Sequence, residues 1–218
     1  MTSLGPLVPR SARWAGPLLI FGSLQFVVAM IVTQLRYPGY SDISNYVSDL
    51  GSSSSPFAFL FNDSIRILGV LGVLAALLIR PAFAPRTSNR IGIAALVVAS
   101  VGAFLVGSYP EGSPQLNGSI HSVVSLVTFL GSGVALLTLG PGMMRDTRWD
   151  GFRGYTFFSG VITIVALVLF VAIANPPLIG PGGAERIIIA PILLWAVVVG
   201  SHLLTLRAYA PAAVASSS

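Results

Sequence analysis

Six long apolar segments, separated by short polar loops, limit what this chain can fold into. The segments are residues 16–35, 56–79, 91–108, 119–139, 155–174 and 187–206. Each is about 20 residues long, the length of an α-helix that crosses a hydrocarbon core of about 30 Å. Only 9% of the 218 residues are charged, whereas a soluble domain carries about 25%. The sequence therefore predicts an all-α, polytopic membrane bundle of six transmembrane helices over residues 15–207, flanked by tails at 1–14 and 208–218.

The first apolar segment has the position of a secretory signal peptide but not its details. It is longer than the apolar region of a typical signal, and no small-x-small cleavage site follows it before Arg36. We therefore expect it to be retained as a transmembrane helix.

The arginines predict which side of the membrane each loop faces. The chain has twelve Arg and no Lys, and nine of the twelve lie in the N-terminal tail, in the loops 80–90 and 140–154, or at Arg207. Short cytoplasmic loops are enriched in positive charge. The sequence thus predicts a multi-pass plasma-membrane protein with both termini in the cytoplasm. Because these loops account for the excess of positive charge, we expect no nucleic-acid partner.

The first outer loop, residues 36–55, has the pattern of a short amphipathic helix. Ser41 or Ser44 can begin this helix and Gly51 can end it. One predicted face is apolar and the other polar: Ile43, Tyr46, Val47 and Leu50 against Asp42, Asn45 and Asp49. Such a helix would lie at the membrane surface or cap the bundle.

Charged and polar side chains gather near the predicted outer ends of the helices. The candidate binding residues are Asp49, Asn62, Asp63, Arg66, Glu111, His121, Glu185 and Arg186. They come from the first outer loop, the second span, the loop and start of the fourth span, and the approach to the sixth. Ionisable groups beside apolar sequence are costly in a membrane and often mark a functional site. The structural alternative is that Asp63 pairs with Arg66, and Glu185 with Arg186.

Three functions fit such a cluster. A binding protein would hold a lipid headgroup, an ion or a partner without chemistry. A membrane-embedded lipid hydrolase or lipid-remodelling enzyme would use Glu111 or Asp49 as a base, His121 as an acid, and Arg66 or Arg186 to orient a phosphate. A small-molecule transporter would need polar groups near the bilayer midplane, where the spans carry only Ser and Thr.

No cofactor motif is evident, and a divalent metal is the cofactor that the residues leave open. Its candidate ligands are Asp49, Glu111 and His121. The second histidine, His202, is predicted to lie about 15–20 Å from His121 in depth, so the two cannot ligate one ion or one haem iron. The chain has no Cys, which excludes disulfides and thiolate metal sites. The expected partners are membrane lipids, with a second copy or another membrane protein as the alternative.

Several short motifs resemble a bacterial and archaeal six-pass membrane family, catalogued as domain of unknown function 998. The motifs are Y-S-D-I-S-N-Y-V-S-D-L-G (40–51), F-N-D-S (61–64), G-S-Y-P-E-G (107–112) followed by His121, and G-A-E-R (183–186) leading into Trp195. The resemblance covers residues 15–207 and implies recurrent polar residues at Ser48, Asp49, Asn62, Glu111, His121, Glu185 and Arg186. The family is similar to a eukaryotic six-pass group that includes a glycosylphosphatidylinositol lipid-remodelling factor, which points by analogy of fold to lipids.

Overall fold

Six long helices make up most of the protein. The computed structural model describes residues 7–173 and 178–209. Within this part of the chain the helices are α1 (Arg10–Leu35), α2 (Ala58–Ile79), α3 (Thr87–Ser108), α4 (Ile120–Gly142), α5 (Phe152–Ala172) and α6 (Gly180–Thr205). All six are long and apolar enough to cross a membrane. The predicted six-helix membrane fold is therefore confirmed.

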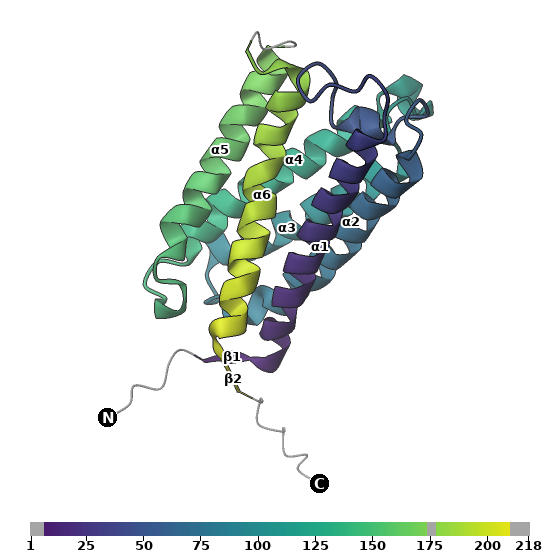
Figure 1. Cartoon of the computed structure of the whole chain (residues 1–218). Helices are drawn as coiled ribbons and strands as arrows, with labels where there is room; N and C mark the ends of the chain where they lie inside the picture. Colours follow the sequence, from purple (N-terminus) through teal and green to yellow (C-terminus); the bar gives the residue numbers. More distant parts are fainter. Residues whose placement is uncertain (1–6, 174–177, 210–218) are drawn as a thin grey trace, which may run out of the picture.

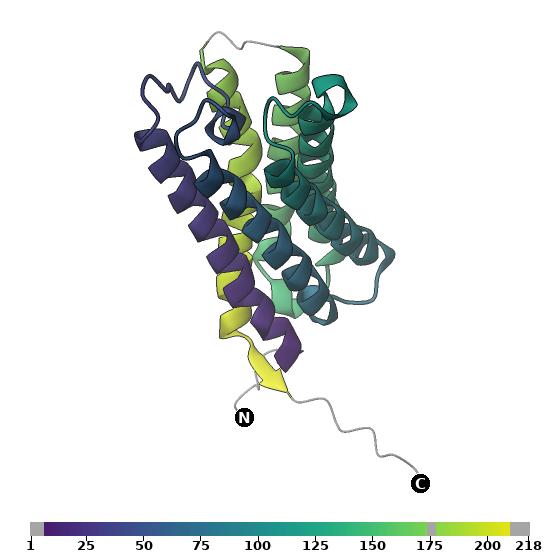
Figure 2. The same ribbon diagram turned by 90° about the vertical axis from the view of Figure 1, so that its right-hand side faces the viewer.

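The helices form a ring in the order of the sequence. Each helix packs against the next along the chain, and α6 packs against α1 to close the ring (Figure 1). Two short strands, β1 (Leu7–Pro9) and β2 (Arg207–Tyr209), pair in parallel at one end of the bundle (Figure 2). We call the opposite end, which carries the loop between α1 and α2, the outer end. The strand pair was not predicted.

Small residues allow the helices to approach closely. A Cβ atom on Gly69 of α2 would overlap the backbone of Ser100 and Phe104 on α3. Such contacts are typical of membrane bundles, where lipid supplies no hydrophobic force between helices. Towards the end with the strands, a large apolar cluster surrounds the buried indoles of Trp149 and Trp195. A smaller cluster at the outer end includes Phe26 and Leu50.

Five of the six helices extend beyond their predicted bounds, and α1 and α6 do so by the most residues. Helix α1 begins at Arg10, within the stretch expected to be a tail. Helix α6 begins at Gly180, seven residues before its predicted start, so Glu185 and Arg186 lie inside the helix. Its Gly-Pro-Gly-Gly start resembles a loop in sequence, but proline is well tolerated in the first turn of a helix. The sequence Asn175-Pro176-Pro177, which is expected to end the fifth span because proline cannot continue a helix, and the outermost parts of both tails lie outside the described residues.

The predicted amphipathic helix in the first outer loop is wrong in extent. The loop has turns followed by a four-residue 3₁₀ helix, η1 (Ser48–Gly51). The side chain of Asn45 accepts a hydrogen bond from the backbone N–H of Ser41, and that of Asp49 accepts one from the N–H of Tyr46. Such local side-chain bonds compete with helix formation. The predicted end at Gly51 is correct.

Candidate functional site

Glu185 attaches the first outer loop to helix α6. Its side chain is only 7% exposed, and Oε2 accepts a hydrogen bond of 2.7 Å from the backbone N–H of Val47. Val47 directly precedes η1, so this bond fixes Ser48 and Asp49 above the second turn of α6. On the other side of η1, Asn62 of α2 donates to the carbonyl of Gly51 at 2.9 Å. Asn62 therefore connects the end of η1 to helix α2.

Arg186 braces the same loop against α1. Its guanidinium donates to Oδ1 of Asp42 at 2.9 Å, to Oε1 of Gln34 at 3.1 Å and to the hydroxyl of Tyr40 at 3.1 Å. Burial raises the pKa of Tyr40 above 10.0 although Arg186 opposes this shift. The phenol consequently stays protonated and donates to the carbonyl of Tyr46. Because the donors of its guanidinium are engaged in these bonds, Arg186 has a structural role.

His121 of α4 is held in one orientation. Its ring is buried, and Nδ1 lies 2.8 Å from the carbonyl oxygen of Tyr109. A carbonyl can only accept a hydrogen bond, so Nδ1 carries the proton and Nε2 of the neutral ring is an acceptor. Nε2 lies 3.4 Å from Oε2 of Glu111 and 3.4 Å from Oγ of Ser125. A neutral His121 can thus take a proton from a neighbouring group, and a protonated one pairs with Glu111.

These groups face an open hollow of about 540 Å³ at the outer end, which we call the outer vestibule. Its polar lining comes from the first outer loop, from the segment before α4, and from α4 and α6: Tyr46, Ser48, Asp49, Glu111, His121, Ser122, Ser125 and Glu185. Its apolar wall lies between α4 and α5 and includes Leu126 and Val171, which are exposed on the membrane-facing surface. The vestibule is therefore polar towards the loop and apolar towards the bilayer.

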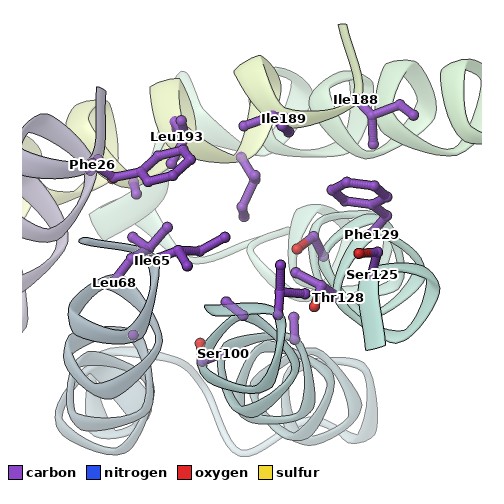
Figure 3. Close-up of a pocket in the computed structure, with 18 of the residues that line it drawn as sticks. Phe26, Ile65, Leu68, Ser100, Ser125, Thr128, Phe129, Ile188, Ile189 and Leu193 are labelled. Carbon is purple, nitrogen blue, oxygen red and sulfur yellow. The ribbon is translucent and has the colours of Figure 1, made fainter. Parts of the chain in front are cut away.

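A second space, the apolar cavity, lies inside the ring of helices. It has a volume of about 120 Å³ and is lined by α1, α2, α3, α4 and α6 as well as by the start of η1. Figure 3 shows side chains around this space, among them Phe26, Leu68 and Leu193. On α6 the lining runs from Glu185 to Ala196, about 16 Å at 1.5 Å per residue. The cavity is therefore long, narrow and mainly apolar.

The outer vestibule and the apolar cavity meet at shared residues. Ser48, His121, Ser125, Phe129 and Glu185 line both spaces. The polar residues of this set form the boundary between the outer vestibule and the apolar cavity. The two spaces are therefore neighbours, one with a partly polar lining and the other mainly apolar.

The structure brings together four of the eight predicted site residues and places the other four elsewhere. Asp49, Glu111, His121 and Glu185 line the outer vestibule. Asn62 and Arg186 support the loop but line neither space, and Asp63 with Arg66 forms an ion pair of 2.6 Å. The side chains of that pair are 57% and 38% exposed, so they do not belong to a buried site.

The three candidate metal ligands do not form a metal centre in this arrangement. Within residues 7–173 and 178–209, no three His, Asp or Glu side chains lie in a group that could hold one ion. Asp49 uses one oxygen to accept from Tyr46 and Asn45, while His121 turns Nδ1 to a carbonyl. The geometry instead favours binding by hydrogen bonds and charge.

Several residues of the site were not predicted from the sequence. Ser122 and Ser125 line the vestibule, and Ser125 lies one helical turn from His121, a spacing that could have indicated it. Phe170 of α5 contacts Tyr46 edge-on at the vestibule. Apolar residues such as Phe170 carry no sequence signal, because both lipid-facing and cavity-facing positions are apolar.

Fold and site together define a polytopic helical membrane protein with an amphipathic internal site at its outer end. The chain belongs to the family described as Protein of unknown function (DUF998), whose profile matches residues 20–202. The resemblance seen in the sequence motifs is thereby confirmed. No curated protein and no solved structure shows significant similarity to the chain.

Proposed function

We propose that this protein binds a membrane lipid, with part of one apolar chain in the apolar cavity and the polar headgroup in the outer vestibule. The observation that carries this proposal is the shared lining of the two spaces by Ser48, His121, Ser125, Phe129 and Glu185. A ligand that fills both must be apolar at one end and polar at the other. A membrane lipid has this shape and is present at high concentration around the bundle.

The surroundings of the site support a lipid over an ion or a small transported solute. The wall between α4 and α5 is apolar and exposed at Leu126 and Val171, so a lipid can reach the vestibule sideways from the bilayer. The lining of the apolar cavity ends at Ala196 on α6, nine residues before the helix ends at Thr205. A space closed at that depth by the buried cluster around Trp149 suits a bound chain better than a transport path.

Trp195 provides a direct test, because its buried indole lines the apolar cavity. Trp14 is 68% exposed and would be quenched by surrounding lipid, so Trp14→Phe is the background. In that background, lipids brominated in mid-chain should quench fluorescence, and Trp195→Phe should remove this quenching. Quenching that is unchanged by Trp195→Phe would contradict the proposal.

Two substitutions that enlarge a side chain distinguish binding inside the apolar cavity from contact with lipid on the outer surface of the bundle. Ala103→Leu adds atoms to the wall of the cavity and should weaken quenching of Trp195. Ala190→Leu on the exposed face of α6 is the matched control and should leave it unchanged. Equal quenching in both variants would place the lipid outside the ring.

Hydrolysis of the bound lipid is the second candidate function, and the orientation of His121 favours it. Nε2 of the neutral ring faces the vestibule next to Ser125. It could take a proton from water as the water oxygen attacks an ester carbon, and return that proton to the departing alcohol. Release of fatty acid from a reconstituted ester lipid, lost in His121→Gln, would support this activity. Binding without release in the wild type would leave lipid binding as the function.

A further inference from the structure

We propose that the outer vestibule selects lipids whose headgroup carries an ammonium group, in preference to lipids that end in a phosphate. This inference rests on the proposed lipid-binding function and names the class of headgroup. The vestibule is lined by the carboxylates of Asp49 and Glu111, and within the described part of the chain no Arg lines it. Its fixed charges attract a cation and repel an anion.

The arginines that could have held a phosphate are engaged elsewhere. Arg186 is bonded to Asp42, Gln34 and Tyr40, and Arg66 is paired with the exposed Asp63. A phosphate in the vestibule would lie beside two carboxylates and would find only uncharged hydroxyl donors, such as those of Ser122 and Ser125. An ammonium group offers three donors.

Two carboxylates still have oxygens to offer. Asp49 accepts its hydrogen bonds from Tyr46 and Asn45 at Oδ2, and in the described residues none reaches its Oδ1. Glu111 contacts His121 through Oε2, and its Oε1 has no hydrogen bond from the described residues. Both side chains belong to the vestibule lining. A headgroup donor between them would complete their hydrogen bonding.

An orphaned hydroxyl in the apolar cavity independently points to a ligand. Ser23, at the middle of α1, is 1% exposed and lines the cavity. Its Oγ has no hydrogen-bond partner in the described structure. A buried polar atom without a partner costs about 1–3 kcal/mol. A ligand chain that carries a hydroxyl or carbonyl oxygen at this depth would provide this partner, whereas a plain hydrocarbon chain would not.

Matched probes can test the headgroup class. Three single-chain amphiphiles with the same mid-chain bromines would carry a primary ammonium, an uncharged hydroxyl or a phosphate, and quenching of Trp195 would report binding in the Trp14→Phe background. We expect the ammonium probe to bind about tenfold more tightly than the phosphate probe. Brominated phosphatidylethanolamine and phosphatidylglycerol then distinguish a phospholipid source of the ammonium from a free long-chain amine.

Conservative variants connect the preference to the vestibule. Asp49→Asn and Glu111→Gln keep the shape of each side chain and an acceptor oxygen, and each should reduce the preference for ammonium. Asp63→Asn removes an exposed carboxylate outside the vestibule and should leave the preference unchanged. If the probes quench Trp195 but the phosphate probe binds as tightly as the ammonium probe or more tightly, this inference is wrong and the proposed lipid binding still stands. Failure of every probe to quench Trp195 would overturn the proposed function as well.

Discussion

The guanidinium of Arg186 connects three segments that are far apart in the sequence. It bonds to Gln34 at the end of α1, to Tyr40 and Asp42 in the first outer loop, and to the carbonyl of Gly182 within α6. Arginine suits this role because its planar group offers five donors in a fixed geometry. Arg66, by contrast, has one exposed partner. Two arginines at the same end of the molecule are therefore expected to contribute differently to the stability of the fold.

Replacing these two arginines should show this difference. Arg186→Gln removes charge-assisted hydrogen bonds to partly buried acceptors and should lower the free energy of unfolding by about 2 kcal/mol. Arg66→Gln breaks an exposed pair and should cost less than about 1 kcal/mol. Denaturant unfolding in the same detergent micelle measures both. Equal losses in the two variants would argue against the bracing role of Arg186.

Asp146, in the loop between α4 and α5, makes stability depend on pH. Burial raises the pKa of Asp146, but the hydrogen bonds and charge of Arg148 outweigh burial and lower it below 3.8. A carboxyl group with a lowered pKa stabilises the fold above pH 3.8, and this contribution is lost as the pH falls through the folded-state pKa. Asp146→Asn should thus be less stable than the wild type at pH 7, by about 1 kcal/mol.

The difference between wild type and Asp146→Asn should shrink as the pH falls below about 3.8. Unfolding midpoints of the two proteins, measured from pH 7 to pH 3, test this dependence. A gap of constant size across that range would mean that the loss at pH 7 arises from packing rather than from charge.

At the scale of elements, the first outer loop depends on helix α6 for its shape. The N–H of Gly182 donates to the carbonyl of Ile43 at 3.1 Å, while Glu185 binds the N–H of Val47. A Cβ atom on Gly182 would overlap the carbonyl oxygens of Asp42 and Asn45. The loop therefore covers the outer end of the ring because the start of α6 leaves room for its backbone.

Gly182→Ala should displace this loop. Because the chain has no Cys, Ser55→Cys gives a single reporter at a buried loop position. Its reaction with a maleimide should be at least several-fold faster when Gly182 is replaced by Ala. Gly154→Ala is the control, since a Cβ atom there meets nothing within 4 Å, and it should leave the rate unchanged. No acceleration in Gly182→Ala would show that the loop tolerates the added methyl group.

Helix positions were predictable from the sequence, whereas helix orientations were not. A run of apolar residues long enough to cross a bilayer forms a helix whatever its neighbours. Which face of that helix turns inward depends on packing between helices, and lipid-facing and interior positions are equally apolar. Asp63 and Arg66 were therefore grouped with the predicted site, although they line neither space. Asp49, Glu111, His121 and Glu185 were identifiable because ionisable residues are rare in such a chain.

At the scale of the whole molecule, the arrangement of arginines predicts how the bundle is oriented in the membrane. The structure has the strand pair β1–β2 and the loop between α2 and α3 at one end, and the first outer loop at the other (Figure 1). Most of the arginines lie towards the end with the strands. From the positive-inside rule we expect this end to lie in the cytoplasm.

Single-cysteine labelling tests this orientation. Ser54→Cys lies on the exposed first outer loop, and Thr87→Cys lies exposed at the start of α3, towards the opposite end. A membrane-impermeant maleimide should label Ser54→Cys in intact cells and Thr87→Cys only after permeabilisation. The reverse pattern would mean that the vestibule opens to the cytoplasm.

The pairing of β1 with β2 has a consequence for how the chain order relates to the fold. Leu7 lies beside Arg207, and α6 packs against α1 just as every other helix packs against its successor. Around the ring, no neighbour relationship marks α1 as a beginning. A circularly permuted protein could join these two strands by a short linker and begin instead in the loop at Gly112. Every helix would then keep its two neighbours in the ring, because the ring of helices is closed although the polypeptide is linear.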